Sequence, residues 1–318
     1  MNKNENIIIE ERANKGELSV DNNENNEKKT TFRDIIKEKF PSLSPTAYRI
    51  AVIAFCLYSV LLAVFRAFAI EKSVEFPGFT GGSDVYKLDD TVYTRVFFVL
   101  YCLGAVAAFL ISLFSHKITY GANKRSNSFV FVSSLAGFCM VGCAGFFVYR
   151  MGLIEAEFSK LNYWIIIFML LTGTFFAMDA VGFITKKTKP WFNVGVVIFS
   201  VLRVLSDFIE LHGKQNVSSN EYHIVSLTAL LIFFCCNSRL HIYGSANIWF
   251  RFFGLFAALS TIIYALPEIY ISLFEPYYVD SIFIFCIVDA VLAFYVLTKL
   301  LSIRSIKENV SESVGEKE

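Results

Sequence analysis

Residues 191–211 read WFNVGVVIFSVLRVLSDFIEL, an apolar stretch long enough to cross a lipid bilayer as a helix. At the helical repeat its polar residues fall on one face, and valine, leucine and phenylalanine fill the rest. Because an arginine near the middle of a membrane costs about 2.5–3.5 kcal/mol, this face cannot contact lipid. We therefore expect the other helices to pack around this one. The polar face consists of Asn193, Ser200, Arg203, Asp207 and Glu210.

The composition of the whole chain indicates the same class of protein. Apolar residues make up 55% of its 318 residues, with 34 Phe and 15 Tyr among them. The charged residues gather in the two tails and the short connections, so apolar runs of membrane-spanning length lie between them. This pattern is typical of an all-α, polytopic transmembrane helix bundle in contact with a lipid bilayer. The net charge of +1 gives no indication of nucleic-acid binding.

Eight membrane spans are predicted between residues 46 and 301. Lysine and arginine mark every second connection, so the positive-inside rule places both termini in the cytoplasm. The fifth span is the least apolar, and if it were not inserted the later topology would invert. The predicted spans are 46–70, 94–115, 128–150, 162–185, 191–211, 221–239, 247–273 and 279–301.

The two tails are predicted to be cytoplasmic. Residues 1–30 are rich in Asn, Glu and Lys and cannot build a core, so they are expected to be disordered, and 302–318 form a second tail. Residues 31–41 fit a short amphipathic helix that lies on the inner leaflet or docks onto a partner. The first long apolar run begins near Tyr48, too late for a signal peptide. Ser44 and the following proline predict the start of the first span.

Ionisable residues inside the spans are the candidates for function. Counted from the predicted ends, Arg203 and Asp289 lie near the middle of the membrane. If their helices are neighbours, these residues form an ion-paired cluster that faces an outward-opening cavity. Two interpretations stay open: a substrate or proton site, or ion pairs that pin the bundle together. The pathway candidates are Arg66, Arg203, Asp207, Glu268 and Asp289, and Asp179 lies in the fourth span towards the cytoplasm.

Small residues predict where the helices approach each other. The third span is dense in Gly, Ala, Ser and Cys, so it is expected to lie centrally, with Gly104 of the second span and Gly173 and Ala177 of the fourth as contacts. Cys139 and Cys143 share a face of this span, and we interpret them as packing residues rather than a metal or redox pair.

No metal or cofactor site is predicted. His212 and His223 flank the connection after the fifth span, but their spacing with Glu210 and Glu221 matches no ligand motif. The sequence contains no HExxH, GxSxG, Walker A or CxxC motif, so no enzyme activity is predicted. The leading hypothesis is a transporter for a small solute, coupled to an ion. The alternative is a membrane-embedded sensor, regulatory or partner-binding protein, with a membrane or cytoplasmic protein as its partner.

One region resembles a known group of proteins. It runs from Arg203 to Gly244 and contains Arg203-x-x-x-Asp207-Phe, a turn from Asn216-Val217-Ser218 to Glu221-Tyr222, and a helix end with Asn237-Ser238-Arg239. It is similar to a stretch found in uncharacterised multi-pass membrane proteins of Clostridia. The resemblance implies a bacterial cytoplasmic membrane and, since those proteins have no assigned activity, no particular function.

Overall fold

A computed structural model describes residues 42–75, 87–88, 91–115, 127–153, 160–182, 189–212, 218–243, 248–274 and 282–302. Within these ranges, eight helices are long and apolar enough to cross a membrane, which confirms the predicted all-α, polytopic class. The predicted tail 1–30, the amphipathic segment 31–41 and the tail 302–318, apart from Ser302, lie outside the described residues.

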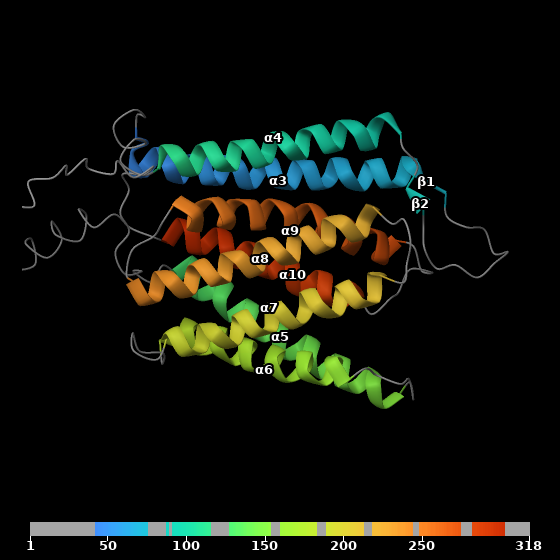
Figure 1. The fold of residues 1–318 in the computed structure, drawn as a ribbon, viewed down its shortest axis with the longest axis vertical. Coiled ribbons are helices and arrows are strands. Elements are labelled where there is room, and N and C mark those ends of the chain that lie inside the picture. Colours follow the sequence, from blue (N-terminus) through green and yellow to red (C-terminus); the bar gives the residue numbers. More distant parts are fainter. Residues whose placement is uncertain are drawn as a thin grey trace, which may run out of the picture. The chain divides into compact units, whose positions relative to one another are not determined.

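Each predicted span corresponds to one helix, and a two-stranded antiparallel sheet joins the ends of α3 and α4 (Figure 1). Helix α6 ends at Val181, before the predicted residue 185, because the chain leaves the helix at Gly182, whose φ of 94° is accessible mainly to glycine. The elements are α3 (Pro45–Ser73), β1 (Val74–Glu75), β2 (Lys87–Leu88), α4 (Val92–Phe114), α5 (Asn127–Leu153), α6 (Lys160–Val181), α7 (Lys189–His212), α8 (Ser218–Tyr243), α9 (Ile248–Phe274) and α10 (Ile282–Ser302).

Hydrogen bonds at two helix ends fix where α3 begins and where α4 stops. As predicted, Ser44 caps α3, since its hydroxyl oxygen accepts a hydrogen bond from the backbone N–H of Ala47 at 3.1 Å. At the C-terminal end of α4, the buried Arg251 of α9 donates from Nη1 to the carbonyl oxygen of Ser115 at 2.5 Å. A cation at this position satisfies a carbonyl group that has no partner within the helix.

The central helix of the bundle is α9, so the expectation that the helices pack around residues 191–211 is wrong. Helix α9 packs against α3, α4, α8 and α10 (Figure 1), and 72% of its membrane-spanning core is buried, compared with 33% for α7. Helix α7 packs mainly against α6 and α8. The reason is that one polar face needs protein on one side only, and the apolar remainder of α7 is free to contact lipid.

Close helix contacts were predicted correctly in one place and wrongly in another. A Cβ atom on Gly137 of α5 would lie 2.8 Å from the carbonyl oxygen of Gly173 and 2.9 Å from the backbone nitrogen of Ala177, as expected for the third and fourth spans. Gly104 of α4, in contrast, faces Leu259 of α9 and Tyr58 of α3 rather than the third span. The position beside α4 is occupied by α9, the helix that packs against both α3 and α4.

Candidate functional site

The polar face of α7 points into the protein, as its sequence predicts. Asn193 and Arg203 are each 1% exposed and Ser200 is 7% exposed, whereas the side chain of Glu210 lies outside the described part. Asn193 accepts a hydrogen bond from the side-chain amide of Asn237 on α8 at 3.3 Å. This buried amide pair links α7 to α8 towards one end of the helices, and Arg203 occupies the same face further along α7.

Arg203 is paired with carboxylates on two helices. Its Nη2 atom lies 3.3 Å from Oδ2 of Asp289 on α10 and 3.6 Å from Oδ2 of Asp207, one turn along α7. The side chains of Arg203 and Asp289 are each 2% exposed, and that of Asp207 is 13% exposed. The guanidinium group also stacks on Phe285, with its central carbon 3.8 Å from the ring centroid. The predicted pairing at equal depth is therefore present.

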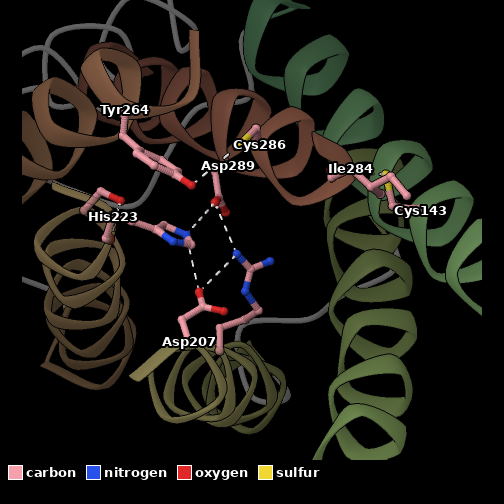
Figure 2. Close-up of polar contacts among 9 residues, drawn as sticks. Cys143, Asp207, His223, Tyr264, Ile284, Cys286 and Asp289 are labelled. Carbon is pink, nitrogen blue, oxygen red and sulfur yellow. Dashed lines mark hydrogen bonds and ion pairs between the residues drawn. The ribbon is translucent and has the colours of Figure 1, made fainter. Parts of the chain in front are cut away.

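His223 of α8 completes the group, which we call the charged cluster: Arg203, Asp207, His223 and Asp289 (Figure 2). Its Nε2 atom lies 3.3 Å from Oδ2 of Asp207 and 3.8 Å from Oδ2 of Asp289. His223 was considered only as a possible metal ligand and was not among the pathway candidates, because it stands near a connection. The helical spacing of the polar residues of α8 could have identified it, since His223, Ser226 and Asn237 lie on one buried face of this helix.

A second ion pair lies between α3 and α9. Arg66 Nη2 is 3.7 Å from Glu268 Oε1, and the two side chains are 5% and 3% exposed. Tyr264 connects this pair to the charged cluster, because its ring stacks on His223 with a centroid separation of 4.2 Å and lies 5.8 Å from the Arg66 guanidinium carbon. All five pathway candidates therefore form ion pairs, in two groups that share contacts with Tyr264; four of them are buried, and Asp207 is partly buried.

Asp179 does not belong to either group. It is 1% exposed in α6, a helix that contributes no side chain to the charged cluster or to the second ion pair. Its burial agrees with the expectation that intramembrane charges face the protein interior. Helix α6 packs against α5, as the small residues of the third and fourth spans predicted, and against α7.

Arg203 and Asp289 are closed to solvent, whereas the sequence led us to expect an outward-opening cavity beside them. The side-chain exposures of Arg203 and Asp289 are too small for a water-filled passage to reach them in this conformation. A groove of about 480 Å³ lies elsewhere, between α3 and α4, and its lining is apolar. It is lined by Ala51, Ala54, Phe55, Tyr58, Leu100, Leu103, Ala107 and Ile111.

The chemistry open to the cluster is proton exchange and charge recognition. Arginine stays charged in proteins, whereas carboxylates and imidazole both gain and lose protons. Throughout the described ranges, no three or more His, Cys, Asp or Glu side chains are placed to hold a metal ion. Cys143, on the α5 side of the view in Figure 2, lies with its Sγ atom 3.8 Å from the carbonyl oxygen of Ile284.

Comparisons of the chain with protein-family models, with curated proteins and with solved structures gave no match. The resemblance of the region from Arg203 to Gly244 to membrane proteins of Clostridia therefore stays a prediction. The charged cluster, rather than a relative, is the basis on which a function can be proposed.

Proposed function

We propose that this polytopic membrane protein is a transporter for a small solute, coupled to a proton, and that it is not an enzyme. The observation that carries the proposal is the composition of the charged cluster: one arginine faces two carboxylates and a histidine, all of them largely or fully buried. The eight candidate spans supply the bundle that such a transporter requires.

The charges of the cluster do not balance without an added proton. With His223 neutral, Arg203 supplies one positive charge against the two negative charges of Asp207 and Asp289. An unbalanced charge in a low-dielectric interior is costly by several kcal/mol. One proton added to His223 or to a carboxylate would make the total charge of the four side chains zero.

Because the charged cluster lies between three helices, proton binding to it is coupled to the packing of these helices. Its side chains come from α7, α8 and α10, and Oδ2 of Asp289 is within 4 Å of both Arg203 and His223. Gain or loss of the proton changes the attraction between these three helices. A ligand shifts a conformational equilibrium only by its difference in affinity for the two states, and a proton in this position provides such a difference.

The alternative is a membrane-embedded sensor or regulatory protein. The low exposure of Arg203 favours this second candidate, because a closed cluster also holds a bundle together without transport. A sensor binds its ligand without moving it across the membrane. The two candidates therefore differ in whether a solute drives a proton flux.

The test is a solute-driven proton flux in proteoliposomes that contain a trapped pH-sensitive dye. A panel of amino acids, carboxylates, sugars and polyamines is added outside, and the internal pH is followed. We expect at least one solute to move protons with the parent protein. Asp289→Asn should abolish the flux, since Arg203 and Asp207 then balance without a proton. Glu221→Gln, an exposed carboxylate on the helix that carries His223, is the matched control.

The outcomes separate the candidates. If a solute raises the thermal stability of the purified protein and no solute in the panel drives a proton flux, the sensor interpretation replaces transport. If Asp289→Asn retains the solute-driven proton flux of the parent, the charged cluster is not the coupling site.

A further inference from the structure

Pro267 interrupts the hydrogen bonding of the central helix. It lies inside α9, which continues as a helix from Ile248 to Phe274. Proline has no backbone N–H, so the carbonyl group four residues earlier, that of Ile263, loses its usual donor within the helix. Ile263 is 0% exposed, and a buried carbonyl without a donor is destabilising. The interruption therefore requires a partner from outside α9.

Arg66 of α3 supplies that partner. Its Nη1 atom donates to the carbonyl oxygen of Ile263 at 2.6 Å, while its Nη2 atom lies 3.7 Å from Glu268, the residue directly after Pro267. A guanidinium group that donates to a carbonyl forms a charge-assisted bond, stronger than a neutral one. One side chain thus contacts α9 on both sides of the proline.

The interruption lies next to the charged cluster. Tyr264 follows Ile263 directly in the chain, and its ring stacks on His223 at 4.2 Å with an interplanar angle of 9°. The Arg66 guanidinium also faces the rings of Tyr222 and Tyr264, at 5.0 and 5.8 Å from their centroids. A change in the direction of α9 at Pro267 therefore moves a ring that covers the cluster.

We propose that Arg66 is a latch on a hinge in α9. Its bond to the Ile263 carbonyl holds the helix continuous across Pro267. Its release lets the segment that begins at Tyr264 and ends at Phe274 change direction, which separates Tyr264 from His223 and admits water to the charged cluster. Prolines are a common cause of helix bending. The proposal rests on the contacts of Arg66 and stands whether the cluster carries a proton or only binds the helices together.

A native cysteine reports on this opening. Cys286 of α10 is 0% exposed, and its Sγ atom lies 3.8 Å from the hydroxyl of Tyr264. A water-soluble maleimide reacts with this thiol only when the region around Tyr264 opens. Cys236 of α8 is a suitable second reporter, since it lies about 20 Å further along the helix axis than His223.

The experiment uses two versions of the full-length protein in detergent, one with Cys286 and one with Cys236 as its single cysteine. Arg66→Met is combined with Glu268→Gln, so that neither member of this ion pair remains charged without the other. We expect the labelling rate of Cys286 to rise about tenfold, the factor that corresponds to one buried hydrogen bond. Labelling of Cys236 should stay at the parent rate.

Restoring the backbone donor should reverse the effect. Pro267→Ala supplies an N–H to the Ile263 carbonyl, so its addition to Arg66→Met and Glu268→Gln should return Cys286 labelling to near the parent rate. The latch is refuted if the rate in the double variant is unchanged or if Pro267→Ala does not lower it. An equal rise at Cys236 also contradicts it, because Arg66 would then hold the whole bundle.

A milder variant covers the case in which the double variant does not fold. Pro267→Ala alone keeps Arg66 and adds a hydrogen bond to α9, so Cys286 should label more slowly than in the parent. A rate equal to or above that of the parent would show that α9 does not open at Pro267.

Discussion

Replacing Arg203 by alanine should destabilise the protein, and the two carboxylates should differ in how far their removal compensates. Arg203→Ala leaves Asp289 buried at 2% exposure without its cation, and breaking such a pair costs about 3–5 kcal/mol. For a protein of this size that corresponds to a fall in Tm of about 4–8 °C. Asp207 is 13% exposed and keeps His223 at 3.3 Å, so its carboxylate is better accommodated.

The double variants provide the decisive comparison. Adding Asp289→Asn to Arg203→Ala should recover more of the lost Tm than adding Asp207→Asn. The measurement is the fraction of monodisperse protein that remains on size-exclusion chromatography after heating in detergent. Glu221→Gln, at an exposed carboxylate of α8, is the control and should melt like the parent. The reasoning fails if Arg203→Ala also melts like the parent, or if Asp207→Asn rescues it better.

Three further predictions concern packing, topology and the N-terminal segment. Gly137→Ala should lower the Tm, because its methyl group meets the backbone of α6, whereas Gly142→Ala, with nothing within 4 Å, should not; equal Tm values would contradict the close contact. In a cysteine-free background, a cysteine at Ser219 should react with an impermeant thiol reagent in intact cells and one at Asn123 should not; the reverse pattern would overturn the orientation. The peptide 31–40 should become helical on anionic vesicles, and a coil signal in circular dichroism at saturating lipid would contradict this.

Hydropathy and charge were enough to predict the helices but not their neighbours. The eight spans follow from length and composition, and Arg203 and Asp289 were matched by depth, since a buried arginine requires a carboxylate at its own level. The depth of a residue in the membrane does not specify which helices lie beside its own helix. Gly104 was therefore assigned to the wrong neighbour, and α9 was not recognised as the central helix.

His223 and the contact between Arg66 and Ile263 were not predicted, because neither leaves a distinctive pattern in the nearby sequence. His223 lies at the start of α8, where a polar residue is expected in any case, and only its register with Ser226 and Asn237 distinguishes it. The contact between Arg66 and Ile263 spans 197 positions of the chain. Proline at position 267 implies an unpaired carbonyl, yet no local pattern identifies the side chain that binds it.

The distance along the chain between Arg203 and Asp289 also sets an order of events during biosynthesis. The two residues are 86 positions apart. At usual elongation rates about 4–17 s separate the synthesis of α7 from that of α10. During this interval the nascent α7 has Asp207, one turn away, as a provisional partner for its arginine, and α8 brings His223 before α10 emerges. Asp207 is thus the first carboxylate that is available to Arg203, and Asp289 becomes available only when α10 is synthesised.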